Sequence, residues 1–272
     1  MSDPAPSAGE LLRTGQLAAA IEAANTAVRS SPADFAKRLL LAELLVFGGN
    51  IQRADVILDA AAQLDPTTAV VVAQFRQLLR AENARRQCLT EGRVPEFLGE
   101  PTAALVAELA ARVALRAGDA AEAASKAAEA ENVRPRVAGT FDTPSGSQEF
   151  SDFRDADDLY AGFFEVLTST GKYFWIPTER IASVEFHPPR RLSDLAWRPA
   201  AMSVINGPDG EVYLPALYVS TEPSPSEELS LGRTTEWLGE EDGLVRGVGQ
   251  RMFLVGDDAY GITDLTVVRF AA

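Results

Sequence analysis

The chain is poor in the side chains that most often hold metals or act as nucleophiles. Its 272 residues include one cysteine, Cys88, and one histidine, His187. A single cysteine excludes a disulfide within the chain and fits a reducing compartment. The same scarcity excludes a Cys/His metal cluster within one chain, so we expect no metal and no cofactor.

Long hydrophobic runs are also missing. The runs Leu39–Val46 and Val70–Ala73 are far shorter than the roughly 20 residues that a membrane-spanning helix needs. The first 28 residues show no basic start followed by an unbroken apolar stretch, so we expect no secretory signal. These observations predict a cytoplasmic protein without a membrane partner.

Positive charge is scarce as well, and the deficit is uneven. The net charge is −14, of which residues 1–135 carry −3 and residues 136–272 carry −11. Binding to nucleic acid or to an anionic membrane requires clustered positive charge, so both partners are disfavoured. The acidity favours simple solubility over the steering of a basic partner.

What the chain does have is a repeat of 34 residues near its start. Leu17, Ala20, Ala24 and Pro32 recur as Ile51, Ala54, Leu58 and Pro66, and Gly15 recurs as Gly49. This period is the tetratricopeptide length, in which each unit is a pair of helices. After Pro66 the period drifts, and a cleaner copy returns at residues 115–135, so we expect three to four units, with a generic helical bundle as the alternative.

The apolar spacing predicts helices over residues 16–28, 35–47, 51–64 and 70–89. Residues 1–135 are therefore expected to form a domain of tetratricopeptide-like helical repeats, in which Ala20 and Ala54 let helices cross closely. The segment 136–150 contains glycine, proline and serine and is predicted to be a linker or an ordered loop.

Residues 151–272 differ in composition from the first half, and their pattern predicts a compact, mostly antiparallel α+β domain. Short β-branched and aromatic segments indicate strands at 174–176, 181–186, 202–205, 211–218, 234–238, 251–255 and 265–270. Short helices are expected at 155–164 and 192–197. The predicted fold class is thus α+β, with helical repeats followed by a β-rich domain.

The sequence contains no complete motif for catalysis. The acids Asp152, Asp155, Asp157 and Asp158 lack the glycine and distal glutamate of a calcium loop, so helix capping and solvated charge explain them better. The segment Ser169–Lys172 lacks the first glycine of a phosphate loop and predicts a tight turn between strands. We therefore expect a protein that is not an enzyme and has no small-molecule substrate.

Aromatic and basic residues offer candidate partner-binding positions instead, because Trp and Arg are enriched at protein interfaces. In the second half these are Phe174, Trp175, Arg180 and Trp197; on the repeats they are Arg38, Leu41 and Leu45. The competing interpretation places both tryptophans in the core.

Several stretches resemble a known family. The segments Leu167–Phe186, Pro188–Pro199, Gly207–Tyr218, Thr235–Trp237 and Gly243–Met252, with Leu11–Ala20 near the start, are similar to the signature of the ImpE family, also called SciE or TagJ. The resemblance covers nearly the whole chain.

The resemblance implies a non-enzymatic adaptor of a bacterial type VI secretion system. Its implied partners are the small sheath subunit, of the TssB/VipA class, and the disassembly ATPase ClpV in some systems. Two alternatives remain: an enzyme with an unrecognised site in the β-rich half, and a chaperone of the sheath subunit that makes no contact with the ATPase.

Overall fold

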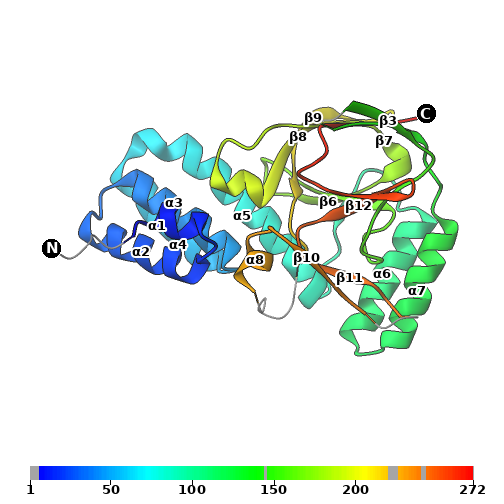
Figure 1. Cartoon of the computed structure of the whole chain (residues 1–272), viewed down its shortest axis with the longest axis horizontal. Helices are drawn as coiled ribbons and strands as arrows, with labels where there is room; N and C mark the ends of the chain where they lie inside the picture. Colours follow the sequence, from blue (N-terminus) through cyan, green and yellow to red (C-terminus); the bar gives the residue numbers. More distant parts are fainter. Residues whose placement is uncertain (1–5, 144–145, 220–225, 240–242, 272) are drawn as a thin grey trace.

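The computed structural model describes residues 6–143, 146–219, 226–239 and 243–271. Antiparallel helices form its first half and a large sheet dominates its second half (Figure 1). The predicted fold class, helical repeats followed by a β-rich part, is confirmed. Within these ranges, no helix is both long and apolar enough to cross a membrane.

The helices of the first half follow the predicted pattern. They are α1 (Ala8–Arg13), α2 (Leu17–Ser30), α3 (Phe35–Phe47), α4 (Ile51–Leu64), α5 (Ala69–Thr90), α6 (Ala103–Arg116) and α7 (Ala120–Val133). Gly15, Gly49 and Gly118 each lie two residues beyond a helix, with φ of 80°, 74° and 80°. Glycine takes this left-handed conformation without a Cβ clash, which ends one helix and lets the next begin.

Small residues hold the hairpins together as expected. Ala20 and Ala54 have no exposed surface, and Leu58 is equally buried. A larger side chain at either alanine would force neighbouring helices apart. The 34-residue spacing therefore marks equivalent packing positions in α2 and α4.

The main sheet has nine strands in the order β1-β6-β5-β9-β8-β7-β14-β2-β3. Its strands are β1 (Glu96–Phe97), β2 (Gly139–Thr143), β3 (Gly146–Phe150), β5 (Phe163–Leu167), β6 (Tyr173–Pro177), β7 (Ile181–Phe186), β8 (Trp197–Val204), β9 (Asp209–Pro215) and β14 (Val267–Phe270). Among the strands of this sheet that the structure describes, β1 with β6 is the only parallel pair, and the other neighbours are antiparallel.

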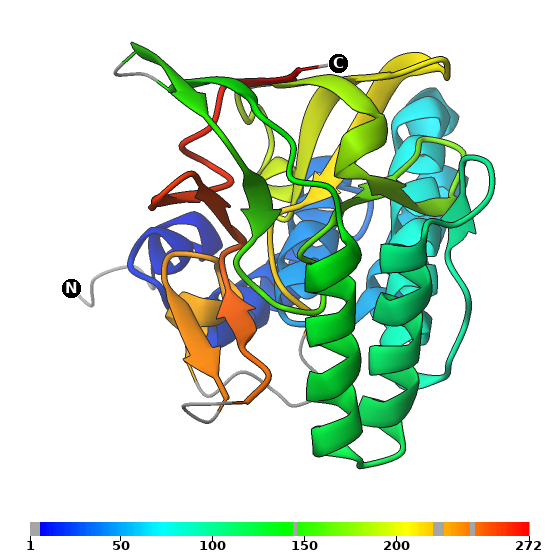
Figure 2. The same ribbon diagram turned by 90° about the vertical axis from the view of Figure 1, so that its right-hand side faces the viewer.

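Two smaller sheets complete the second half. β4 (Phe153–Asp155), β12 (Met252–Val255) and β13 (Asp258–Gly261) form one, and β10 (Thr235–Leu238) with β11 (Arg246–Gly249) forms a hairpin. The short helix α8 (Glu227–Ser230) precedes that hairpin. Figure 2 shows α6 and α7 standing side by side below the main sheet.

The hydrophobic core does not stop at residue 135. One cluster joins Leu41, Phe75 and Leu105 of the helices to Trp175 and Trp197 of the sheet. A second cluster, rich in phenylalanine, fills the space between the main sheet and the β4-β12-β13 sheet. The division into domains at residues 1–135 and 151–272 stays a prediction, and a shared core spans it.

Three local predictions were wrong. Within the predicted linker, 136–150, β2 and β3 form a hairpin of the main sheet, with residues 144 and 145 outside the described part. Residues 192–197 form only a 3-10 turn, Leu192–Leu195, before β8 begins.

The third wrong prediction is the helix at 155–164, where β4 ends and β5 begins. Asp155 accepts a hydrogen bond from the backbone N–H of Asp157 at 2.9 Å, and Asp157 accepts one from that of Leu159 at 2.8 Å. Such Asx turns compete with helix formation. These two aspartates are also buried, at 1% and 2% exposure, instead of solvated as expected.

Candidate functional site

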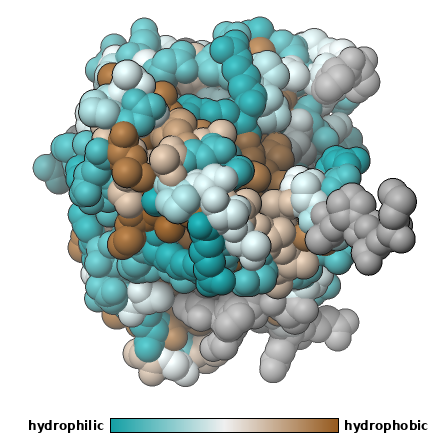
Figure 3. Space-filling view, turned by 90° about the vertical axis from the view of Figure 1, so that its left-hand side faces the viewer, coloured by the Kyte–Doolittle hydropathy of each residue, from teal (hydrophilic) through white to brown (hydrophobic). Residues whose placement is uncertain are grey.

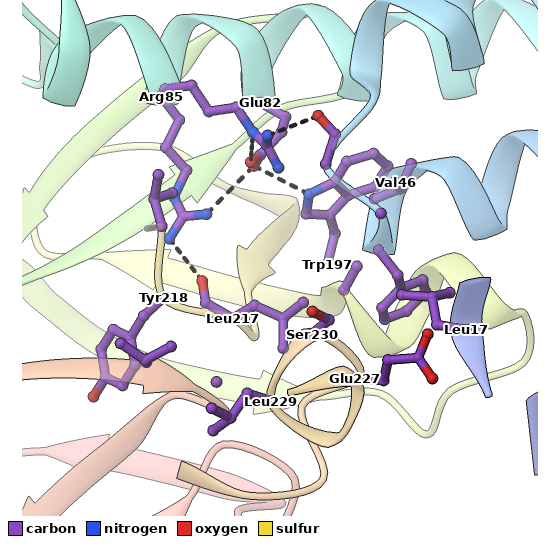
Figure 4. A pocket seen from close by; sticks show the side chains of 18 of the residues that line it. Leu17, Val46, Glu82, Arg85, Trp197, Leu217, Tyr218, Glu227, Leu229 and Ser230 are labelled. Atoms are coloured by element: carbon purple, nitrogen blue, oxygen red, sulfur yellow. Dashed lines mark hydrogen bonds and ion pairs between the residues drawn. The ribbon is translucent and has the colours of Figure 1, made fainter. Parts of the chain in front are cut away.

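A cleft of about 580 Å³ opens where the repeats meet the β-rich half (Figure 4). Helix α2 and the turn between α3 and α4 form one wall. The segment from Leu217 to Val219, with α8 and β11, forms the other. Helix α5 and the start of β8 close the bottom.

The walls of the cleft are largely apolar. Leu17, Ile21, Val46 and Phe47 come from the repeats; Leu217, Leu229 and Val248 face them from the other half. Hydrophobic walls with a few polar groups at the bottom are typical of binding clefts.

Charged side chains at the bottom of the cleft are paired with one another. Glu82 accepts hydrogen bonds from the Trp197 indole Nε1 at 3.2 Å and from Arg86 Nε at 2.9 Å. Arg86 also donates to the backbone oxygen of Gly49 at 3.0 Å, and Arg85 donates to that of Leu217 at 2.8 Å. These bonds join α5 to both walls.

Below the cleft lies a buried network of ions. Arg85 donates to both carboxylate oxygens of Glu165, at 3.0 and 2.8 Å. Arg251, the residue before β12, also forms an ion pair with Glu165 and donates a hydrogen bond to Asp155 at 2.9 Å. All four side chains are at most 4% exposed. Helix α5 and three different strand regions are thereby tied together.

The electrostatics follow from this pairing. Burial alone would raise the pKa of Glu165, but Arg85 and Arg251 beside it hold that pKa at about 2. Asp157 lacks a bonded arginine, so burial and the charge of Asp155 raise its pKa to about 7. Burial also raises the pKa of Glu108 well above its usual range. The two arginines therefore keep Glu165 ionised, whereas burial favours the protonated forms of Asp157 and Glu108.

Two hydrogen bonds join α8 and Arg233, three residues after it, to the repeats on the other side of the cleft. Glu227 accepts a hydrogen bond from the backbone N–H of Ala18, at the start of α2, at 2.7 Å. Arg233 donates to the backbone oxygen of Leu12 at 2.6 Å. Both contacts join residues more than 200 positions apart in the chain, so the cleft is a product of the complete fold.

Neither Cys88 nor His187 belongs to the cleft lining. Cys88 is buried elsewhere, and burial raises the pKa of its thiol to about 11. His187 pairs with Glu211 at 2.9 Å on the surface. Among the described residues, no group of three or more His, Cys, Asp or Glu is arranged to hold a metal ion. The arrangement suits binding by shape and burial.

Four of the predicted partner-binding residues come together, but inside the shared core. Trp175, Trp197, Leu41 and Leu45 are 0–3% exposed and belong to the shared core. Trp197 reaches the bottom of the cleft, whereas the other three side chains present almost no surface, and the structure supports the competing interpretation of both tryptophans as core residues. Trp175 packs under the Arg112 guanidinium, 4.7 Å from its ring centre.

The other three predicted residues are partly exposed but lie apart. Phe174 packs beside the second, phenylalanine-rich cluster. Arg180 donates to the backbone oxygens of Leu98 and Glu100, each at 2.7 Å, and Arg38 donates to that of Pro32 at 2.6 Å. Both arginines thus hold loops in place, and partner binding by these three residues stays a prediction.

Sequence reasoning missed the ion network at the bottom of the cleft. A signal was available for Glu165, the only charge in the segment Phe163–Leu167, all of which is buried. A charge inside an otherwise apolar strand needs a buried partner. Its partners, 80 and 86 residues away, could not be read from the sequence.

Helical hairpins of tetratricopeptide length define the first half as a helical-repeat structure, a class that presents binding surfaces. The ImpE protein family matches residues 147–269. The type VI secretion system accessory component TagJ of Pseudomonas aeruginosa is 33% identical over 97% of this chain and 90% of its own length. The chain therefore belongs to the ImpE family.

The fold is shared with a solved structure. The crystal structure of protein VPA1032 from Vibrio parahaemolyticus matches with a TM-score of 0.89 and 28% identity, over 97% of each chain. The arrangement of the helices and the sheet is thus that of an experimentally known fold.

Proposed function

We propose that this protein is a non-enzymatic accessory adaptor of a bacterial type VI secretion system, acting in the cytoplasm. In this proposal it binds the small sheath subunit, of the TssB/VipA class, and links the sheath to the ClpV ATPase. The observation that carries the accessory role is the likeness to TagJ, which extends over 97% of the chain and so includes both halves.

The geometry supports binding over catalysis. The cleft has apolar walls, and its charged groups at the bottom are engaged with each other, so a ligand would gain mainly by burying apolar surface. An adaptor also needs two separate surfaces. Repeats at one end of the molecule and a sheet at the other give the chain room for both (Figure 1).

Purified full-length protein should be tested for binding to the small sheath subunit and to ClpV by isothermal titration calorimetry. The adaptor predicts that a ternary complex forms when all three are mixed. A chaperone predicts binding to the sheath subunit alone. Failure to bind the sheath subunit would remove the proposal.

Deletion of residues 1–135 is unsuitable for locating the contact. It would remove Arg85 and leave Glu165 buried without one of its two arginines. The remaining half would also lose the helices that cover Trp175 and Trp197. Point variants in the complete chain are needed instead.

A further inference from the structure

A second hollow, with a volume of about 370 Å³, shares two lining residues with the cleft, Phe47 and Leu217. Its other walls include the end of α1, the turn Leu192–Leu195 and the segment Leu231–Arg233, which follows α8. These segments are far apart in the sequence, so the hollow exists only in the complete fold. Because its charged lining residues are two arginines, we call it the arginine pocket.

The walls of the arginine pocket are mostly apolar, and one leucine among them is open to solvent. Leu12, Leu192, Leu195 and Leu231 line the pocket together with Leu217. Leu195 is 41% exposed, so a ligand that covered it would gain free energy by burying apolar surface. Exposed apolar surface alone does not define a binding site here, because Figure 3 shows brown, hydrophobic patches among teal, hydrophilic residues at the outer end of the repeats as well.

The charge of its lining distinguishes the arginine pocket. Its charged residues are Arg13 and Arg233, and the described residues that line it include no acid. The cleft, by comparison, is lined by two arginines and two glutamates. The chain as a whole has a net charge of −14, so a hollow whose charged residues are both cations runs against the overall charge. Charge complementarity therefore indicates an anionic ligand.

Arg13 is available to pair with that anion. It is exposed, and its side chain forms no hydrogen bond and no ion pair with any other residue that the structure describes. Glu10, one turn earlier on α1, attracts Arg13 but is itself hydrogen-bonded to Ser7, at 2.7 Å to the backbone N–H and at 2.8 Å to the hydroxyl. A guanidinium donates charge-assisted hydrogen bonds, and a carboxylate can accept two of them in parallel.

The other polar groups of the lining are donors that neighbouring residues hold in place. Arg233 donates to two backbone oxygens at the end of α1, at 2.6 and 3.2 Å, so its positive charge stays at the pocket. Arg233 also pairs with Glu228 at 3.3 Å, so Arg13 supplies most of the attraction for an anion. Thr263 accepts a hydrogen bond from Nε2 of Gln250 at 2.8 Å, which leaves its own O–H to donate.

The volume lies at the low end of the roughly 300–1,000 Å³ of ligand pockets, so the arginine pocket fits the end of a chain better than a helix. A carboxyl-terminal residue carries a side chain and a carboxylate on one Cα, which matches apolar walls with cations beside them. We propose that the arginine pocket binds the carboxyl-terminal residue of a partner protein, an apolar residue whose carboxylate pairs with Arg13. This site goes beyond the proposed function, because it requires neither the sheath subunit nor the ATPase.

Fluorescence polarisation with short peptides tests the site on the full chain. The probes are fluorescein-labelled peptides, Gly-Ser-Gly-Ser followed by Leu, Ile, Val or Phe, each made with a free carboxylate and with a carboxyl-terminal amide. At least one peptide with a free carboxylate should bind, and amidation should weaken its Kd at least about tenfold, because it removes the charge that pairs with Arg13. N-acetyl-leucine, which has the same side chain and carboxylate without a chain, serves as competitor and should displace the peptide only at higher concentration.

Point variants locate the bound peptide. Arg13→Gln should weaken the Kd of the free-carboxylate peptide at least about tenfold, whereas Arg13→Lys keeps the charge and should retain most of the affinity. Leu195→Ser removes an exposed apolar contact and should also weaken binding. Arg29→Gln is the matched control, because Arg29 is an exposed arginine of the same repeats outside the pocket, and the Kd should stay unchanged. Circular dichroism checks that each variant keeps its secondary structure.

Each of three results would overturn the assignment. If none of the peptides binds, or if the acids and amides bind equally well, the pocket does not recognise a carboxylate. If Arg13→Gln binds the peptide as tightly as the wild type does, the peptide binds elsewhere. If N-acetyl-leucine displaces the peptide at the same concentration as the unlabelled peptide does, the ligand is a small free carboxylate and not a chain end. None of these measurements involves the sheath subunit, so this proposal and the proposed function fail separately.

Discussion

The ion pair between Arg85 and Glu165 should be a main determinant of stability, and replacing Arg85 by Met tests this. Arg85 is 4% exposed and bonds Glu165 twice, at 3.0 and 2.8 Å. Without Arg85, Glu165 keeps only Arg251, which it shares with Asp155, so the buried cluster carries excess negative charge, which we expect to cost about 3–5 kcal/mol. For a chain of this size, that corresponds to a melting temperature roughly 6–20 °C lower.

Arg76→Met is the matched control, because Arg76 lies on the same helix and also pairs with two acids. Its bonds to Asp55 and Asp59 are both 2.6 Å, but its side chain is 27% exposed. Pairs open to solvent contribute only about 0–1 kcal/mol. Urea denaturation followed by tryptophan fluorescence and far-ultraviolet circular dichroism measures both variants.

The same experiment tests whether the halves fold together. Trp175 and Trp197 report on the sheet side of the core, and circular dichroism reports mostly on the helices. Because one core spans both, the two signals should share one transition. A cost for Arg85→Met no larger than that for Arg76→Met, or two separate transitions in the wild type, would refute the reasoning.

Three further predictions follow from single residues. The pKa of Asp157 is about 7 in the folded protein, above its ordinary 3.8, so the protonated carboxyl stabilises the fold at low pH and this stabilisation is lost as the pH rises from about 4 to 7. The free energy of unfolding of Asp157→Asn minus that of the wild type should therefore grow over this window and stay level above it. Cys88, buried and with a pKa of about 11, should react with Ellman's reagent only after denaturant is added; fast labelling of the native protein would contradict its burial. Gly139→Ala should destabilise the protein by about 1–3 kcal/mol in urea denaturation, because its Cβ would lie 2.1 Å from the Arg269 backbone oxygen. Gly210→Ala is the control and should cost well under about 1 kcal/mol, because a Cβ at Gly210 would meet no atom within 4 Å.

The local parts of the fold were predictable from the sequence because they depend on near neighbours. Helix α2 follows from apolar residues at helical spacing, and the glycine after α3 follows from the need for a positive φ at the helix end. The turn before β6 was correctly predicted too, with Gly171 at φ 84°. Each of these features is determined within one or two turns of chain.

The wrong predictions arose where the same residue type is common in two kinds of local structure. Aspartates occur both at helix starts and in Asx turns, and the run from Asp152 to Asp158 gave no local reason to prefer the turn. What decides is long-range: Asp155 bonds Arg251, and Asp157 accepts from the backbone N–H of Gly247, 90 residues on. Such pairings are made by the sheet topology, which the sequence did not reveal.

The sequence did not decide whether Trp175 and Trp197 are buried, for a related reason. Trp and Arg are enriched at interfaces, but the same residues stabilise buried networks, where the indole N–H and the guanidinium need acceptors. Trp197 donates to Glu82, and Arg85 lies beside it. A tryptophan predicted together with a buried acid on a neighbouring helix is better explained as part of the core than as a docking residue.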